Sequence, residues 1–251
     1  MGFSGIAGHR AFAHRGWHVG DLTGLENTLP AFRRAVSEGY RYLETDVHAT
    51  ADGVLVAFHD AVLDRVTDSR GPIASLTYRQ VRGALIGGRE PIPTLAEVLQ
   101  ACPGALLNID PKSDRAVGPL VDMLGQEHAW DRVCIGSFSD RRIAAIRRAG
   151  PPGLATSLGP RAAGRLVVSR LRFSGAAGSE AFAAQLPVRW RGVRIVTENL
   201  VRRAHARGLE VHAWTVDDPT DMTRLLDAGV DGIMTDRPDI LRTVLDARGL
   251  W

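Results

Sequence analysis

The chain contains little cysteine and almost no lysine. Its 251 residues include two cysteines, Cys102 and Cys134, which lie 32 positions apart without a CxxC spacing. A disulfide framework or a zinc knuckle is therefore not expected. Basic residues never occur in runs longer than two and are interspersed with acidic ones, which leaves a formal net charge of +3. This distribution gives little support to a nucleic-acid partner.

Long hydrophobic runs are also absent. No stretch approaches the roughly 18 apolar residues of a membrane-spanning helix, and the first ten residues lack the basic and apolar regions of a secretory signal. We therefore expect a cytoplasmic protein with no stable membrane insertion. Hydrophobic residues make up 45% of the chain and charged residues 24%, so the composition predicts a large core and excludes a disordered chain.

Short runs of β-branched and aromatic residues alternate with helical patterns, which is typical of repeated βα units. Eight strands are predicted, at 11–14, 41–47, 105–110, 132–136, 153–158, 192–196, 209–215 and 231–235. Helix starts are predicted after Thr28, Thr94 and Asp218, whose side chains can cap them. Because no linker or low-complexity tract divides the chain, the pattern predicts an α/β fold, a single-domain (β/α)8 TIM barrel over residues 1–251.

Two segments depart from a simple barrel. A further strand over 54–58 follows the second strand after only six residues, which is too few for a parallel return. The pair must therefore form an added antiparallel hairpin that turns at Asp52 and Gly53. Residues 159–192 are long for one βα connection, and we expect a helix followed by an excursion on the barrel rim.

Acidic and cationic residues occur at predicted strand ends, where the active sites of such barrels lie. His14 and Arg15 end the first strand, and Asp110 ends the third. The two-residue period of the second strand puts Glu44 and Asp46 on one face. Like charges inside a barrel raise each other's pKa unless a cation lies between them, so the pattern predicts a divalent metal site. A solvent-exposed face would need no such ion.

Two histidines and two cations flank these carboxylates. The hairpin brings His59 toward the same edge as His14, and two imidazoles can serve as general base and general acid. Lys112 is the only lysine and follows Asp110 closely, which suggests a compact point charge for an anion. With a divalent ion and Arg15 the site would carry a net positive charge suited to a phosphodiester. Glu26 and Asn27 have no capping role and are candidates for lining the site.

Together these residues resemble the glycerophosphodiester phosphodiesterase family of phospholipase-C-like barrels. The resemblance rests on His14-Arg15-Gly16, Glu26-Asn27-Thr28, Glu44-x-Asp46, Asp52-Gly53 leading to His59-Asp60, Ile92-Pro93-Thr94-Leu95 with Glu97, Asn108-Ile109-Asp110-Pro111-Lys112, Ser137-Phe138, Ala213-Trp214-Thr215-Val216 and Gly232-Ile233-Met234-Thr235-Asp236-Arg237-Pro238. The motifs follow one another in order over nearly the whole chain.

The resemblance implies a role for each group of residues. It implies acid–base catalysis by His14 and His59, phosphate binding by Arg15 and Lys112, and binding of Ca²⁺ or Mg²⁺ by Glu44, Asp46 and Asp110. Many members carry Glu where this chain has Asp110, so the preferred ion stays open. Trp214 would line the glycerol side of the pocket, although a tryptophan on a strand is also a common core residue.

The resemblance further implies a metal-dependent hydrolase that cleaves small glycerophosphodiesters to glycerol 3-phosphate and an alcohol. An alternative is lysophospholipase D activity, in which apolar residues of the 159–192 segment would hold an acyl chain. A binding protein that has lost the chemistry would have no need to keep both histidines with all three carboxylates. The alcohol group, the base and acid assignment of the histidines, and the oligomeric state are open at this stage.

Overall fold

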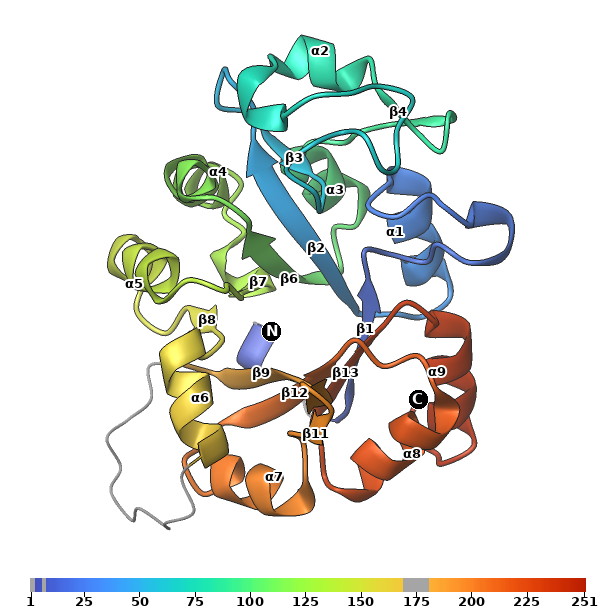
Figure 1. Cartoon of the computed structure of the whole chain (residues 1–251), viewed down its shortest axis with the longest axis vertical. Helices are drawn as coiled ribbons and strands as arrows, with labels where there is room; N and C mark the ends of the chain where they lie inside the picture. Colours follow the sequence, from blue (N-terminus) through green and yellow to red (C-terminus); the bar gives the residue numbers. More distant parts are fainter. Residues whose placement is uncertain (1–2, 6–7, 169–180) are drawn as a thin grey trace.

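The computed structural model describes residues 3–5, 8–168 and 181–251. Eight parallel strands, flanked by helices, form a nearly closed barrel with the strand order β8-β7-β6-β2-β1-β13-β12-β9 (Figure 1). The strands are β1 (Arg10–His14), β2 (Tyr42–Ala49), β6 (Leu106–Pro111), β7 (Val133–Ile135), β8 (Ala155–Thr156), β9 (Ala183–Pro187), β12 (Glu210–Trp214) and β13 (Gly232–Thr235). A parallel bridge between Ser157 and Ala183 links β8 to β9. The predicted TIM barrel is confirmed.

Helices follow most of the barrel strands, and their starts are set by capping side chains. They are α1 (Leu29–Ser37), α3 (Leu95–Ala101), α4 (Val117–Gln126), α5 (Asp140–Ala149), α6 (Pro160–Val168), α7 (Glu198–His205), α8 (Pro219–Asp227) and α9 (Pro238–Asp246). The side chains of Thr28, Thr94 and Asp218 accept hydrogen bonds from backbone N–H groups of the first turn. The three predicted caps are confirmed.

The added hairpin after the second barrel strand is also confirmed. Strand β3 (Leu55–Ala57) pairs antiparallel with the end of β2, with Val47 opposite Ala57. The chain then forms a small excursion with α2 (Tyr78–Arg82), β4 (Leu85–Ile86) and β5 (Glu90–Pro91), drawn at the top of Figure 1. This excursion has its own buried cluster around Phe58 and Ile86, so the loop that follows β3 is held by packing.

The predicted position of the sixth barrel strand was wrong. It was placed at 192–196, but the barrel uses β9, whose sequence AAQLP contains two alanines and no β-branched residue. Its strand conformation depends on pairing with β12 rather than on local propensity. Residues Val193–Arg194 instead form β11, which pairs antiparallel with β10 (Arg189–Trp190). In the predicted 159–192 excursion, α6 is confirmed, and residues 169–180 lie outside the described residues.

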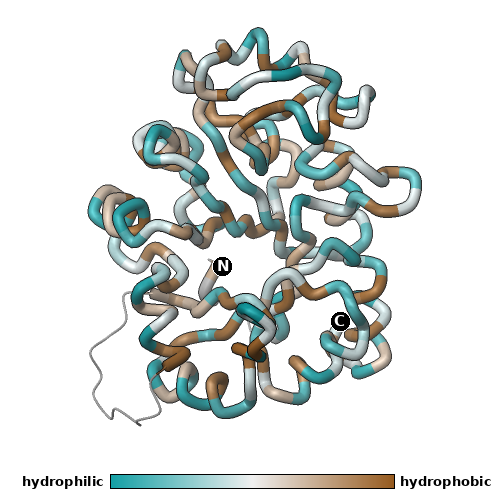
Figure 2. The backbone as a smooth tube through the Cα atoms, viewed as in Figure 1, coloured by the Kyte–Doolittle hydropathy of each residue, from teal (hydrophilic) through white to brown (hydrophobic). Residues whose placement is uncertain are grey.

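The interior of the barrel is packed at its amino-terminal end. Phe12, Tyr42 and Met234 belong to a buried cluster that Phe3 joins from a short 3-10 helix (Phe3–Gly5). Figure 2 shows hydrophobic residues along the strands that enclose this space. The carboxyl ends of the strands carry the polar residues that the sequence assigned to the site. Both cysteines are buried and free.

Candidate active site

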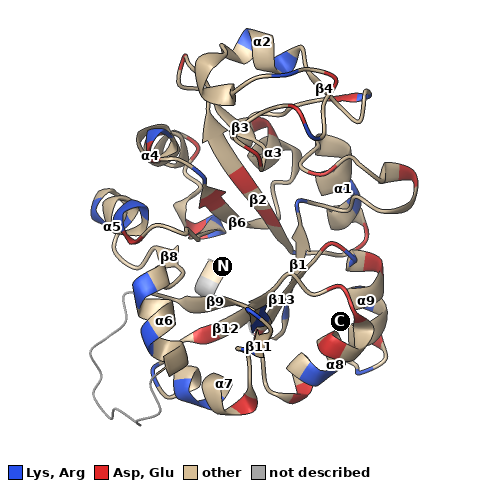
Figure 3. Cartoon of the chain, in the orientation of Figure 1, with Lys and Arg blue, Asp and Glu red and all other residues tan. Residues whose placement is uncertain are grey.

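The carboxylates of Glu44 and Asp46, which are two residues apart on β2, point into the barrel. His14 pairs with Glu44 across β1 and β2, and Asp46 pairs with Asp110 across β2 and β6. Glu44 and Asp46 are 5% and 2% exposed, so both charges are withdrawn from solvent. Figure 3 shows the acidic bands on β2 beside the acidic end of β6. The period-two prediction is confirmed for this strand.

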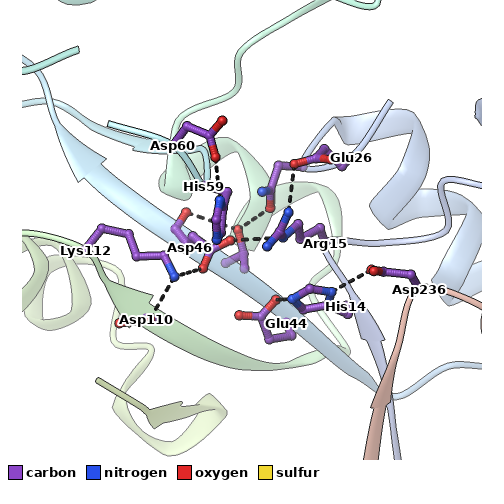
Figure 4. Close-up of polar contacts among 12 residues, drawn as sticks. His14, Arg15, Glu26, Glu44, Asp46, His59, Asp60, Asp110, Lys112 and Asp236 are labelled. Carbon is purple, nitrogen blue, oxygen red and sulfur yellow. Dashed lines mark hydrogen bonds and ion pairs between the residues drawn. The ribbon is translucent and has the colours of Figure 1, made fainter. Parts of the chain in front are cut away.

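Lys112 supplies a cation between two of these carboxylates. Its Nζ lies 2.6 Å from Oδ1 of Asp46 and 2.9 Å from Oδ2 of Asp110 (Figure 4). Burial lowers the pKa of Lys112, but the two carboxylates outweigh burial and raise it, so the ammonium stays charged. Burial raises the pKa of Asp110, despite the nearby ammonium. The lysine thus neutralises part of the negative charge predicted here.

Three buried carboxylate oxygens have no hydrogen-bond donor. They are Oε2 of Glu44, Oδ2 of Asp46 and Oδ1 of Asp110. Burial, together with the Asp46 carboxylate, raises the pKa of Glu44 well above its usual range. Lys112 offsets only part of this charge, and a buried oxygen that accepts no hydrogen bond is costly. Hard oxygen donors are the ligands that Ca²⁺ and Mg²⁺ prefer, so the donor set fits such an ion. As they stand, no three His, Cys, Asp or Glu side chains of the described residues have the geometry of a metal site.

His14 is held by a carboxylate that sequence reasoning did not assign to the site. Its Nδ1 lies 2.6 Å from Oδ1 of Asp236, which follows β13, and its Nε2 lies 3.6 Å from Oε2 of Glu44. An ionised carboxylate only accepts hydrogen bonds, so Nδ1 of His14 donates and Nε2 faces the barrel axis. His18 also contacts Asp236, at 3.2 Å through Nε2. The position of Asp236 after a strand next to β1 is the signal that could have identified it.

The charges around His14 shift its pKa and that of its partner. Burial lowers the pKa of His14, but the carboxylates of Glu44 and Asp236 outweigh it and raise the pKa above the ordinary value. Burial alone would raise the pKa of Asp236, yet the hydrogen bonds from His14 and His18 hold that pKa well below its usual range. The Asp236 carboxylate is therefore ionised over the physiological pH range.

His59, on the other side of the site, is also hydrogen-bonded to an aspartate through Nδ1. Its Nδ1 lies 2.5 Å from Oδ1 of Asp60, and its backbone carbonyl accepts a hydrogen bond from Nε2 of His48 at 3.1 Å. Hydrogen bonds from Arg65 and His59 lower the pKa of Asp60 to about 2. Each of the two predicted catalytic histidines thus has Nδ1 bound to an aspartate. The role of Asp60 as a hydrogen-bond partner was missed, although it adjoins His59 in the sequence.

A chain of ion pairs connects the two histidine loops. Arg15 lies 3.0 Å from Oε1 of Glu26 through Nη1 and 3.3 Å from Oδ2 of Asp46 through Nε. Arg65 then contacts both Glu26, at 2.7 Å, and Asp60, at 2.6 Å. Burial raises the pKa of Glu26, but the two arginines outweigh it and lower the pKa. Arg65 was not assigned to the site, because it lies in an irregular loop without a motif.

Asn27 supports this chain from behind β2. Its Oδ1 accepts a hydrogen bond of 2.8 Å from Thr45, and its backbone N–H donates to the carbonyl of Arg15. Both Arg15 and Asn27 have left-handed backbone conformations, with φ of 57° and 58°. Such conformations are costly for residues other than glycine and persist where the surroundings enforce them. The hydrogen bond between the two backbones keeps Asn27 beside Arg15. The buried Nδ2 of Asn27 makes no hydrogen bond.

Trp214 lies at the carboxyl end of β12 and is half-buried. Its ring packs edge-on against Phe138, with ring centroids 5.5 Å apart. Phe138 is 65% exposed, and Nζ of Lys112 lies 5.9 Å from its ring centroid. Trp214 also packs against the barrel core, as expected for a tryptophan on a strand. The aromatic pair borders the cation of the site.

The chain is similar to known phosphodiesterases over nearly its whole length. The sequence model of the glycerophosphoryl diester phosphodiesterase family matches residues 9–240. Probable glycerophosphodiester phosphodiesterase 2 of Mycobacterium tuberculosis is 43% identical, over 97% of this chain and 93% of that protein. The glycerophosphodiester phosphodiesterase of Caldanaerobacter subterraneus is 31% identical, over 89% of this chain and 94% of that protein.

Two further similarities concern the fold and the alternative activity. A solved structure from Silicibacter pomeroyi has a TM-score of 0.80 and 27% identity, over 97% of this chain and 95% of that one. Lysophospholipase D GDPD1 of Rattus norvegicus is 28% identical, over 94% of this chain and 86% of that protein.

Proposed function

Because the chain belongs to the glycerophosphoryl diester phosphodiesterase family, we propose that it hydrolyses glycerophosphodiesters to glycerol 3-phosphate and an alcohol. It is an enzyme of the phosphoric diester hydrolase class with a small-molecule substrate. The observation that carries the proposal is the matched pair of imidazoles, His14 and His59, each with Nδ1 bound to an aspartate at 2.6 and 2.5 Å. This pairing leaves Nε2 of each ring available for proton transfer.

The two histidines would act as acid and base in turn. One Nε2 takes the proton of the attacking oxygen while the other donates a proton to the departing alcohol oxygen. In the first step the glycerol 2-hydroxyl attacks phosphorus, the alcohol leaves and a cyclic phosphate forms. In the second step water opens the cycle to glycerol 3-phosphate, and the histidines exchange roles. His14 and His59 have matching hydrogen bonds from Nδ1 to an aspartate, so either imidazole can act as the base in the first step.

The phosphate would be bound by the cations of the site. Arg15 and Lys112 carry the positive charge, and Arg65 holds Glu26 and Asp60 in place beside them. Trp214 would face the glycerol carbons. Glu26 and Asn27, which the sequence suggested as substrate contacts, would act mainly by fixing Arg15.

We also propose that a divalent cation, Ca²⁺ or Mg²⁺, binds to Glu44, Asp46 and Asp110. The support is the set of buried oxygens without donors, one from each carboxylate. When bound, the ion would stabilise negative charge on the phosphoryl oxygens. The side chain of Asp110 is one methylene shorter than the Glu that the family resemblance implies here, so we expect it to change the affinity for the ion. The cytoplasmic location expected from the sequence stays a prediction.

Product analysis tests the proposal. The enzyme is incubated with a panel of glycerophosphodiesters, with and without chelator, and then with Ca²⁺ or Mg²⁺ restored. We expect glycerol 3-phosphate as the common product and loss of turnover with chelator. His14→Ala and His59→Ala should each lower turnover at least 100-fold in folded protein. Near-normal turnover in either variant would refute its role, and absence of glycerol 3-phosphate with every diester would refute the activity.

Lysophospholipase D activity is the second candidate. The rat relative with that name and the exposed aromatic ring of Phe138 at the site favour it. Turnover of glycerophosphocholine is compared with turnover of its monoacylated counterpart. We expect the deacylated diester to be the better substrate, and a strong preference for the acylated compound would reverse the order of the two candidates.

A further inference from the structure

A short hairpin projects into solvent at the same end of the barrel as the site. Strands β10 and β11 pair with Arg189 opposite Arg194 and Trp190 opposite Val193. The backbone N–H of Val188, just before the hairpin, donates to the carbonyl of Trp214 at 3.3 Å. The hairpin therefore continues from the carboxyl end of β9, directly beside the aromatic pair that borders the candidate active site.

The tip is a tight and well-defined turn. Arg191 and Gly192 both have left-handed backbones, with φ of 49° and 81°, which is the pattern of a two-residue type I′ turn. Such a turn fixes the strand register, so the pairs on either side keep their positions. The hairpin thus presents a defined set of side chains and is no irregular loop.

The exposed side chains on this hairpin are apolar or basic. Trp190 and Val193 are 61% and 65% exposed, and cross-strand partners share one face of a ribbon. Arg189, Arg191 and Arg194 are exposed as well, and no acidic residue occurs between 188 and 196 (Figure 3). Within the described part of the chain, none of these three arginines has an ion pair. An exposed tryptophan among unpaired arginines is the composition of a surface that meets both apolar and anionic groups.

The arginine pair is unfavourable in the isolated protein. Like charges directly opposite each other on a ribbon destabilise it, and Arg189 and Arg194 occupy such positions. An external anionic partner would remove this repulsion. Side chains alternate along each strand, so this arginine pair lies on the face opposite Trp190 and Val193. A hairpin that enters edge-on among lipid headgroups gives both faces a partner, whereas an oligonucleotide would leave Val193 without an apolar partner.

We propose that this hairpin docks the barrel on the surface of an anionic lipid bilayer. The indole of Trp190 and the side chain of Val193 enter the headgroup region, and the three arginines contact lipid phosphates. No helix among the described residues is long and apolar enough to cross a membrane, so the contact is peripheral. Docking at this end would bring the site close to diesters formed at the lipid surface, an advantage that rests on the proposed function.

Vesicle sedimentation tests the docking. The full chain is mixed with phosphatidylcholine vesicles that either contain or lack phosphatidylglycerol, at low and at high salt. We expect binding that requires phosphatidylglycerol and weakens with salt. The combined Arg189→Ala, Arg191→Ala and Arg194→Ala variant should bind roughly 100-fold more weakly, because each basic residue near an anionic surface contributes about 1 kcal/mol. Trp190→Ala alone should also weaken binding.

A matched control removes the same charge elsewhere. Arg33, Arg41 and Arg148 are exposed arginines on α1, at the start of β2 and on α5. Their combined replacement by alanine should leave vesicle binding within about threefold of the wild type. Circular dichroism confirms the fold of every variant independently of activity.

The outcomes separate this inference from the proposed function. Equal binding by the wild type and the hairpin triple variant, or no dependence on phosphatidylglycerol, would overturn the docking. Tighter binding to a single-stranded oligonucleotide than to vesicles, or a dimer that Trp190→Ala dissociates, would overturn it as well. Phosphatidylglycerol-dependent binding lost in the triple variant would support it, even if no diester were hydrolysed.

Discussion

Nδ1 of His14 lies 2.6 Å from Oδ1 of Asp236, although the two residues are 222 positions apart in the chain. The contact forms because β1 pairs with β13, with Ala13 opposite Thr235. Closure of the barrel therefore assembles the pair. The aspartate fixes the ring orientation and raises the pKa of the imidazole, which matches the arrangement of His59 and Asp60 across the site.

The Asp236→Asn variant should lower kcat by about 10²- to 10⁴-fold with little change in fold, because the amide no longer favours the productive tautomer. The Asp236 carboxylate raises the pKa of His14, so its loss lowers that pKa. The limb of the pH profile of kcat/KM that His14 governs should then move to lower pH. Asp239→Asn, which removes an exposed partner of Arg237, is the control and should change neither. An unaltered kcat in Asp236→Asn would contradict the role.

Arg65 should act by positioning the loops that carry the chemistry. It contacts both Glu26 and Asp60, so Arg65→Ala should lower kcat about tenfold and Arg65→Lys should recover part of the loss. The pH profile should also change, since Arg65 lowers the pKa of Asp60. Arg82→Ala is the matched control, because Arg82 has a similar exposure and a single carboxylate partner, Glu97. A rise in KM alone would instead indicate direct substrate binding.

Ca²⁺ or Mg²⁺ should bind to the folded protein and stabilise it. An ion at about 100 times its Kd should raise the free energy of unfolding by about 2.7 kcal/mol. Glu44→Gln and Asp46→Asn should remove this stabilisation, and Asp110→Glu should change the affinity, as isothermal titration would measure. Glu198→Gln, at an exposed position on α7, should leave binding unchanged. Equal affinities in the wild type and Glu44→Gln would contradict the assigned ligands.

The opposite end of the barrel contains a charge pair that should govern acid stability. Arg10 is 2% exposed and contacts Glu210 at 2.6 Å through Nη2. Burial raises the pKa of Glu210, but the hydrogen bonds from Arg10 and His212 lower it to about 2. The ionised carboxylate therefore stabilises the fold above the ordinary pKa near 4.5, and this contribution is lost as the pH falls toward 2.

Urea unfolding of Glu210→Gln measures this contribution. At pH 7 the variant should lose about 3 kcal/mol of unfolding free energy, because Arg10 is left as a buried charge without its partner. The difference from the wild type should shrink between pH 4.5 and 2. Glu198→Gln removes an exposed ion pair with Arg202 and should cost less than about 1 kcal/mol. A constant difference at all pH values would show that packing, not charge, is lost.

The sequence predicted those parts of the fold and site that depend on local pattern. Alternation along β2 placed Glu44 and Asp46 on one face, and Thr28 was correctly identified as a cap. Strand Ala183–Pro187 was not predicted, because its residues take the strand conformation only through pairing with β12. Asp236 was missed for a related reason, since its contact with His14 depends on which strands become neighbours when the barrel closes.

Lys112 is the only lysine in the chain, and its Nζ lies within 3 Å of two carboxylates of the candidate active site. An amine-selective acylating reagent therefore has one side-chain target, apart from the amino terminus. Mass spectrometry of peptides from the labelled chain would distinguish acylation of Lys112 from acylation of the amino terminus. Protection by an added diester could then be followed without any assay of turnover.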